Sequence, residues 1–189
     1  MAPSDSERAF PFIRLNDRPP KPRRTGVTEI RGPYYTPMGP HYLQDVLDTM
    51  GAYVDTLKFA GGSFSLMPRA AVKNIIDICH RHDVLVSTGG FMEYVLRQSP
   101  NAVCDYIGEC RNLGFDIIEI SCGFITIPME DWVRLVGRVK QAGLKPKPEV
   151  GIQSAPAEPR PLKSWPLRAR AIRNGPSARP SACSTPVPK

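Results

Sequence analysis

One unit recurs four times along this chain: an apolar strand, a loop of small residues, a proline and an amphipathic helix. Strands are predicted at residues 27–32, 55–61, 83–89 and 116–123, and a fifth at 144–152. Strands and helices that alternate about every 30 residues predict right-handed βαβ units around a parallel sheet. The predicted fold class is therefore α/β, an incomplete barrel of about four βα units plus a fifth strand, with disordered termini.

Helix boundaries are marked by two residue types. Each predicted helix begins near one of four prolines, Pro40, Pro68, Pro100 and Pro128. Proline suits the first helical turn, where its missing N–H has no acceptor. Glycines are placed where helices end in the left-handed conformation, at Gly51, Gly114 and Gly143.

Charge divides the chain into three parts, with net charges of +3 for residues 1–25, −2 for 26–153 and +6 for 154–189. We predict a disordered N-terminal tail (1–25), a partial barrel domain (26–153) and a disordered, basic, proline-rich tail (154–189). The pattern changes abruptly after Gln153, which predicts either a departure there from an ancestral reading frame or a divergent splice end. Because the basic charge lies in the tails, no nucleic-acid partner is expected.

Cysteine usage and hydropathy bear on the compartment. The five cysteines include no CxxC pair, and most lie on apolar helix faces, as reduced thiols of an intracellular protein do. No run of 18 apolar residues occurs, and the N-terminus lacks the apolar core of a signal peptide. A cytoplasmic location and no membrane partner are expected.

Charged residues gather on one face of the predicted sheet. Alternation along the strands directs Leu57, Phe59, Ile118, Ile120 and Val150 toward the helices. The opposite face then carries Glu29, Arg31, Lys58, Glu119, Lys147 and Glu149. Charges inside a sheet are costly unless they are paired or used, so internal ion pairs remain one interpretation. Their position near the loop-bearing strand ends favours a second, a site for an anionic substrate or a metal.

Small residues follow three of the strands, in the segments Gly61–Gly62–Ser63, Thr88–Gly89–Gly90 and Ser121–Cys122–Gly123. Exposed backbone N–H groups in such loops bind phosphate or sulfonate oxygens, although tight turns also explain these glycines. The predicted substrate-binding residues are Arg31, Gly61, Gly62, Gly89, Gly90, Ser121 and Lys147.

Five segments occur in a distinctive order: GVTEIRGPYY, DTLKFAGGSF, STGGFMEYV, GFDIIEISCG and LKPKPEVG. Together they resemble the phosphosulfolactate synthase family, including its heat-stress-associated plant and fungal relatives, over residues 26–153. The resemblance implies a TIM barrel and a carbon–sulfur lyase that adds sulfite to phosphoenolpyruvate with Mg²⁺. The product, 2-phospho-3-sulfolactate, serves coenzyme M biosynthesis in the archaeal members.

The resemblance also implies roles for three charged residues. Lys58 would bind the anionic substrate, Glu119 and Glu149 would hold Mg²⁺ or its water, and Gly89 and Gly90 would line the loop. The predicted catalytic residues are thus Lys58, Glu119 and Glu149. The chemistry needs them because sulfite is already a nucleophile, so the protein must neutralise substrate charge and deliver one proton.

Departures from the family pattern predict weak synthase activity. Cys122 replaces an aspartate, Ile152 and Gln153 replace a lysine, and Arg31–Gly32 replaces an Asp-Lys pair. The βα pattern also stops after the fifth strand, whereas TIM barrels commonly bind phosphate at loops seven and eight. An alternative is a non-catalytic heat-stress tolerance protein acting through protein contacts, and a third is a product without independent function.

An incomplete barrel leaves open sheet edges, which predicts association into homo-oligomers, curling into a smaller sheet, or poor solubility. Pro146 and Pro148 remove ladder donors from the fifth strand, which suits an edge position.

Overall fold

The computed structural model of the chain describes residues 8–32, 38–123 and 125–149. Within these ranges five short strands form one sheet: β1 (Glu29–Arg31), β2 (Thr56–Lys58), β3 (Leu85–Ser87), β4 (Ile117–Ile120) and β5 (Lys145–Pro148). The helices that alternate with them are α1 (Pro40–Met50), α2 (Arg69–Arg81), α4 (Ala102–Leu113) and α5 (Met129–Gln141). Three single turns complete the described elements: η2 (Gly51–Tyr53), η3 (Ser63–Leu66) and α3 (Met92–Val95).

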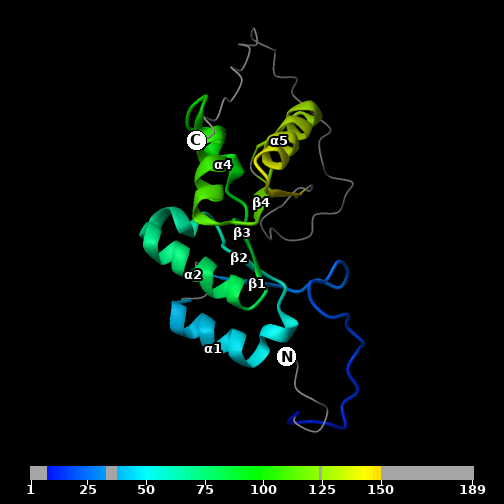
Figure 1. The fold of residues 1–189 in the computed structure, drawn as a ribbon. Helices are drawn as coiled ribbons and strands as arrows, with labels where there is room; N and C mark the ends of the chain where they lie inside the picture. The colour runs from blue at the N-terminus through cyan, green and yellow to red at the C-terminus, as the bar shows by residue number, and fades with distance from the viewer. Residues whose placement is uncertain (1–7, 33–37, 124, 150–189) are drawn as a thin grey trace, which may run out of the picture.

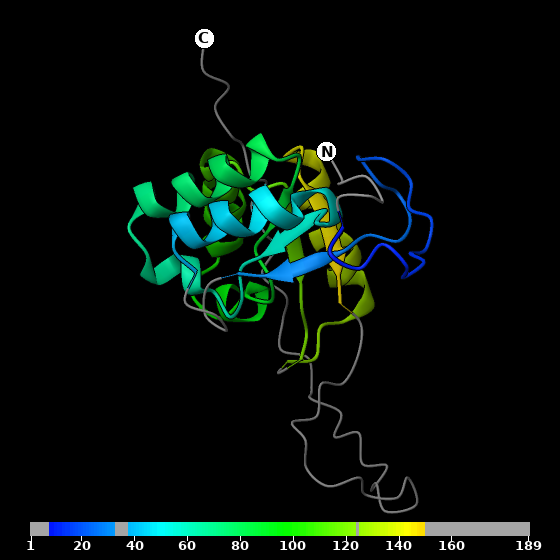
Figure 2. The same cartoon turned by 90° about the horizontal axis from the view of Figure 1, so that it is seen from below.

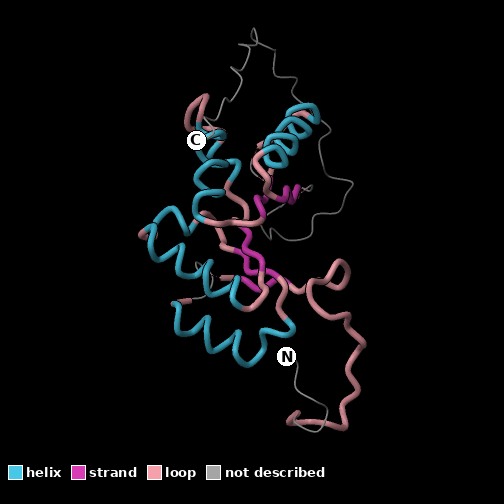
Figure 3. The backbone as a smooth tube through the Cα atoms, viewed as in Figure 1, coloured by secondary structure: helices cyan, strands magenta, loops and turns pink. Residues whose placement is uncertain are grey.

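The sheet has the strand order β1-β2-β3-β4-β5, and all four pairings are parallel. The strands occupy the middle of the molecule and the helices lie around the outside (Figure 1, Figure 3). Helices α1 and α2 lie side by side against the sheet (Figure 2). The predicted α/β class, with four βα units and a fifth strand, is confirmed. Residues 150–152 of the predicted fifth strand and the predicted tail 154–189 lie outside the described residues.

The sheet is curved as a barrel wall is. Glu29 on β1 and Lys147 on β5 belong to the two edge strands, yet the Lys147 Nζ atom lies 2.8 Å from Glu29 Oε1. In a flat sheet, four strand spacings would separate these edges by about 19 Å, further than the two side chains can span. The contact therefore requires the sheet to bend around its charged face.

The core lies between the sheet and its helices. Leu57, Phe59, Ile118 and Ile120, which alternation directs toward the helices, are fully buried there among apolar helix residues. Val150, predicted to face the same way, lies outside the described residues. Alternation along the strands therefore predicted the buried face correctly, and it leaves the other face to polar side chains.

Helix boundaries follow the prolines closely. Pro40 is the first residue of α1, Pro68 and Pro128 are the N-caps of α2 and α5, and Pro100 precedes α4 by two residues. At the other ends, Gly114 (φ +97°) and Gly143 (φ +81°) are left-handed as predicted.

The prediction for Gly51 was wrong. Its φ of −55° is right-handed, because the chain continues from α1 into the short turn η2 instead of reversing after the helix.

Residues 8–28 contain no helix or strand but bond to the amino-terminal side of the sheet. Arg23 Nη1 lies 2.7 Å from Asp55 Oδ1, and both side chains are almost fully buried. Lys21 Nζ donates to the carbonyl of His82 at 2.9 Å. The boundary of the predicted N-terminal tail at residue 25 stays a prediction.

β5 pairs only with β4 and forms one edge of the sheet, as its two prolines predicted. Among the described residues, no helix has the length and apolar character needed to cross a membrane.

Two buried thiols are expected to resist alkylation. Burial raises the pKa of Cys79 and of Cys110 to about 12. At about pH 8, on the order of 10⁻⁴ of each is then thiolate, the reactive form. Brief iodoacetamide labelling followed by peptide mass spectrometry should modify the less buried Cys104 and Cys122 first. Labelling of the urea-denatured chain is the control, and equal labelling of all four in the folded chain would contradict the assignment.

Candidate active site

Five charged side chains form a continuous series on the inner face of the sheet, in the order Glu29, Lys147, Glu119, Lys58, Glu149; we call it the charged ladder. Lys58 Nζ lies 2.8 Å from Glu119 Oε2 and 3.3 Å from Glu149 Oε1. Lys147 Nζ lies 2.8 Å from Glu29 Oε1 and 3.3 Å from Glu119 Oε2. Each lysine therefore bridges two glutamates, and Glu119 lies at the centre.

Strand register produces this arrangement. Glu119 pairs with Lys147 in the β4–β5 ladder, and both point to the inner face. The Glu119 backbone N–H donates to Thr88 Oγ1 at 3.2 Å, and the Glu149 N–H donates to the Ile120 carbonyl at 2.9 Å. Lys58 is the last residue of β2, so its side chain begins at the carboxyl end of the sheet. The inward alternation of the strands thus gathers charges that are far apart in sequence.

Burial controls the electrostatics of Glu119. Its side chain is only 1% exposed, and this desolvation raises the pKa of the Glu119 carboxyl although the lysines oppose the shift. Burial works against the charge of Lys58, yet the hydrogen bond and charge of Glu119, together with the charge of Glu149, raise the Lys58 pKa. The ladder contains three carboxylates and two ammonium groups, so it carries one excess negative charge when all are ionised.

The loop after β3 approaches the ladder so closely that only glycine fits. Gly89 has φ +65°, and a Cβ there would lie 1.9 Å from the carbonyl oxygen of Phe59. The same Cβ would lie 3.3 Å from Lys58 Cε. In the loop after β2, Gly62 (φ +72°) lies directly under the ring of Phe91, where a Cβ would come within 2.0 Å.

Gly90 borders a small polar space. A Cβ at Gly90 would lie 3.3 Å from Ser121 Oγ and 3.4 Å from Glu119 Oε1. Both of these oxygens are buried, and neither has a hydrogen-bond partner among the described residues. Two buried acceptors without donors cost stability unless a ligand or water satisfies them.

The structure brings together most of the residues predicted for the site. Lys58, Glu119, Glu149 and Lys147 form the ladder, and Gly89, Gly90 and Ser121 lie against it. Gly61 and Gly62 belong to the neighbouring β2 loop. Arg31 is the exposed last residue of β1, aligned with Lys58 in the register. Their catalytic and binding roles stay predictions.

Sequence reasoning placed Glu29 on the inner face but did not name it as a site residue, because its partner Lys147 is 118 positions away. It also missed a pocket of about 310 Å³ at the same end of the sheet, lined by Gly61, Gly90, Phe91, Glu93, Tyr94, Arg97 and Ile125. The segment STGGFMEYV contains Phe91, Glu93 and Tyr94. The sequence therefore identified the motif but did not predict that these residues line a pocket.

The two carboxylates predicted to hold Mg²⁺ fit such a role in part. Glu119 Oε1 is a buried oxygen without a donor, which a cation would satisfy. Lys58 already lies between Glu119 and Glu149, and the described residues contain no group of three or more His, Cys, Asp or Glu suited to a metal. Mg²⁺ is commonly held by one or two carboxylates, with water and substrate phosphate completing its shell.

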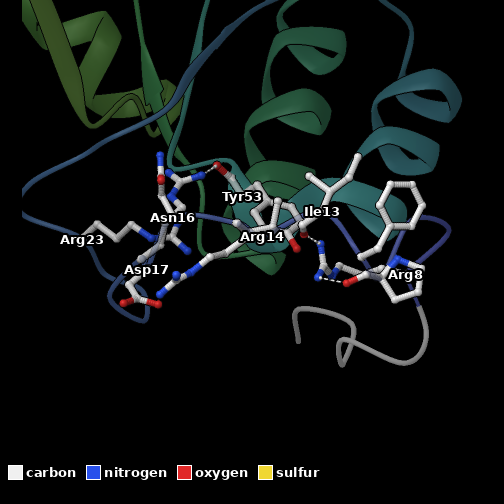
Figure 4. A pocket seen from close by; sticks show the side chains of 11 residues that line it. Arg8, Ile13, Arg14, Asn16, Asp17, Arg23 and Tyr53 are labelled. Atoms are coloured by element: carbon white, nitrogen blue, oxygen red, sulfur yellow. Dashed lines mark hydrogen bonds between the residues drawn. The ribbon is translucent and has the colours of Figure 1, made fainter.

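A second hollow, of about 530 Å³, lies at the amino-terminal side of the sheet between the N-terminal segment and Tyr53 (Figure 4). Its arginines mostly serve the protein itself. Arg8 donates to the backbone carbonyl of Ile13, Arg18 to that of Tyr53, and Arg23 to Asp55. This hollow is therefore separate from the charged ladder, which lies toward the other strand ends.

Comparison with known proteins shows the family of the chain. The profile of the family described as (2R)-phospho-3-sulfolactate synthase (ComA) matches residues 16–176. The chain belongs to this phosphosulfolactate synthase family. The match extends over the whole sheet and all five ladder residues, so the ladder is part of the family domain.

Named relatives fall into two groups. The Arabidopsis thaliana protein HEAT-STRESS-ASSOCIATED 32 is 46% identical over 75% of this chain and 50% of its own length. The phosphosulfolactate synthase of Methanothermobacter thermautotrophicus is 33% identical over 76% of this chain and 54% of its own. That of Methanocaldococcus jannaschii is 32% identical over 59% and 44%. The chain thus spans about half the length of the phosphosulfolactate synthase family members it matches.

A solved structure of D-psicose 3-epimerase with D-tagatose from Clostridium cellulolyticum H10 aligns with a TM-score of 0.33 and 17% identity. The alignment covers 55% of this chain and 41% of the epimerase. At this level the likeness carries no argument about the site.

Proposed function

We propose that the chain's charged ladder serves a phosphosulfolactate synthase reaction, the addition of sulfite to phosphoenolpyruvate. One observation carries the proposal: Glu119 is fully buried beside a glycine loop and contacts two lysines. One of its carboxylate oxygens still has no donor among the described residues. Such an arrangement suits a small anion that needs charge neutralisation and one proton. Under this proposal the chain is a cytoplasmic lyase that acts on phosphoenolpyruvate and sulfite. Its product would serve the synthesis of a sulfonate such as coenzyme M.

The reaction would form one carbon–sulfur bond. The sulfur lone pair of hydrogensulfite bonds to C3 of phosphoenolpyruvate, the C2–C3 π electrons move to C2 and its carboxylate, and a proton is added at C2. The product is 2-phospho-3-sulfolactate. Lys58 would neutralise the charge that develops on the carboxylate, since an ammonium is a compact cation. The proton added at C2 balances the one that hydrogensulfite loses when it becomes a sulfonate.

Mg²⁺ is part of the proposal, with Glu119 and Glu149 as the residues that would hold it. When bound, the cation would supply positive charge to the substrate phosphate and carboxylate. Residues of the chain itself would position the substrate: the lysines would orient the anion, and the Gly89–Gly90 backbone would allow it to approach.

We expect slow turnover because of Cys122. The family pattern has an aspartate at this position, whereas the Cys122 thiol donates here to the backbone carbonyl of Glu149 at 3.6 Å. A carboxylate beside Glu149 would add a hard oxygen ligand for Mg²⁺.

Sulfite-dependent loss of phosphoenolpyruvate, followed by ³¹P NMR with Mg²⁺ present, tests the proposal. We expect slow product formation that Cys122→Asp accelerates and Lys58→Met abolishes. Lys73→Met is the matched control, because Lys73 is exposed on α2 and its ion-pair partner in the described part of the chain is Asp77 alone. The proposal fails if no product forms with either the parent chain or Cys122→Asp, or if Lys58→Met is as active as the control.

A second candidate is a non-catalytic role in heat-stress tolerance through protein contacts, with association of the chain into homo-oligomers. It is supported by the higher identity to the heat-stress-associated plant protein, 46% against 33% and 32% for the archaeal synthases. Under this reading the ladder is a set of internal ion pairs. Absence of turnover together with a concentration-dependent oligomer in analytical ultracentrifugation would favour it.

A further inference from the structure

Both lysines of the charged ladder already form ion pairs with glutamates. Lys58 contacts Glu119 and Glu149, and Lys147 contacts Glu29 and Glu119. An anionic substrate arriving at the ladder meets three carboxylates and two ammonium groups. A further cation close by would therefore favour the binding of a phosphate or carboxylate here.

Arg97 is the cation that the structure offers at this end of the sheet. It lines the 310 Å³ pocket beside Gly61 and Gly90, and its guanidinium has no hydrogen-bond or ion-pair partner among residues 8–32, 38–123 and 125–149. The pocket joins loops that follow three neighbouring strands: Gly61 follows β2, Gly90 follows β3 and Ile125 follows β4. It therefore opens at the carboxyl ends, where ligands of parallel βα folds bind.

Gly90 connects this pocket to the ladder. The residue lines the pocket, and a Cβ on it would lie 3.4 Å from Glu119 Oε1 and 3.3 Å from Ser121 Oγ. Both oxygens are more than nine-tenths buried and lack partners among the described residues. Only the backbone of Gly90 would thus lie between a ligand in the pocket and these two oxygens.

The pocket wall is aromatic. The rings of Phe91 and Tyr94 lie with centroids 5.0 Å apart and planes inclined by 32°, and Phe91 is held in place by Phe64 at 5.3 Å and by Gly62 beneath it. Tyr94 is 55% exposed, whereas a residue of the core would be buried. A fixed, exposed aromatic face beside a guanidinium matches a ligand with a flat ring and an anionic group.

We infer that this pocket binds an organic anion that carries an aryl group, with the anionic group on Arg97 and the ring against Phe91 and Tyr94. The inference goes beyond the proposed function, because phosphoenolpyruvate has no ring for this wall to bury. The pocket is then a separate site for a second ligand, next to the ladder that is proposed to act on phosphoenolpyruvate. Arg97 is the residue that selects this ring-bearing ligand.

Isothermal titration calorimetry of the chain with phenyl phosphate, without sulfite, tests the inference. We expect phenyl phosphate to bind at least about tenfold more tightly than inorganic phosphate, because only the former buries a ring. Arg97→Gln should weaken phenyl phosphate binding by about tenfold or more, since it removes a charge-assisted hydrogen bond. Tyr94→Ala should bring the affinity for phenyl phosphate toward that for inorganic phosphate.

Arg111→Gln is the matched control, because Arg111 is exposed on α4 and lies in a different cleft, between α4 and α5. Urea denaturation should show unchanged stability for Arg97→Gln. Three results would each overturn the inference: no binding of phenyl phosphate, equal binding of inorganic phosphate, or loss of binding in Lys58→Met but not in Arg97→Gln.

The two proposals fail separately. If phenyl phosphate binds through Arg97 while phosphoenolpyruvate is not consumed, the synthase proposal fails and the pocket assignment stands. If phosphoenolpyruvate is consumed and Arg97→Gln changes neither turnover nor phenyl phosphate binding, the pocket assignment fails and the synthase proposal stands.

Discussion

Replacing Lys58 with methionine is expected to lower the free energy of unfolding by about 3–5 kcal/mol near neutral pH. The substitution keeps most of the side-chain volume but removes the ammonium that lies 2.8 Å from Glu119 Oε2. Glu119 is then a buried carboxylate, 1% exposed, whose remaining cation is Lys147 at 3.3 Å. Urea denaturation followed by circular dichroism measures the loss.

The loss should depend on pH in a defined direction. Burial already raises the Glu119 pKa, and removal of Lys58 removes a group that opposes this shift. A carboxyl group whose folded-state pKa exceeds its unfolded value of about 4.3 carries no penalty below that value, and its penalty grows as the pH rises toward the folded-state pKa. Lys58→Met should therefore be less destabilised, relative to the parent chain, at about pH 5 than at about pH 8.

A double variant keeps the prediction testable if Lys58→Met does not fold. Lys58→Met with Glu119→Gln removes both charges of the pair and should recover much of the lost stability, because no uncompensated carboxylate remains. Lys73→Met, which breaks the exposed Lys73–Asp77 pair, should change stability by less than about 0.5 kcal/mol. A loss for Lys58→Met no larger than this control would show that the ladder does not hold the sheet together.

Periodicity predicted the fold well because burial on one side of each strand leaves a clear signature. Leu57 and Ile118 were expected toward the helices, and both are fully buried there. The prolines marked helix starts because their missing N–H is harmless in the first turn. Strand lengths were overestimated: β2 has three residues, Thr56–Lys58, where seven were expected, since the glycine-rich loop leaves the sheet immediately after Lys58.

The candidate site was partly visible in the sequence. Alternation placed Lys58, Glu119 and Glu149 on one face, and the family resemblance drew attention to them. Which charges pair with which depends on sheet curvature, and Glu29–Lys147 joins the two edge strands. No local pattern encodes that contact. The aromatic pocket was missed for a related reason, because Arg97 lies beyond the quoted motif and is related to Gly61 only by the packing of separate loops.

Replacing Gly89 with alanine is expected to destabilise the chain by at least about 3 kcal/mol, whereas Gly90→Ala should cost within about 1 kcal/mol. The two glycines are neighbours in one loop, so they form a matched pair. Gly89 has φ +65°, and its new Cβ would lie 1.9 Å from the backbone carbonyl of Phe59, whose N–H is held by the Ser87 carbonyl of β3. Gly90 is not in the left-handed region, and its Cβ would meet only Ser121 Oγ and Glu119 Oε1 at 3.3 and 3.4 Å.

Gly90→Ala, the variant expected to keep its stability, is expected to lose its function. Because a methyl group on Gly90 would fill the space beside the two unsatisfied oxygens, Gly90→Ala should fold and yet lose sulfite-dependent turnover and weaken phenyl phosphate binding. Urea denaturation measures the first property, and ³¹P NMR and calorimetry measure the others. Equal stability of the two variants would show that the close approach of Gly89 to Phe59 does not constrain the loop. Full activity in Gly90→Ala would show that the space beside Glu119 and Ser121 is not where the ligand lies.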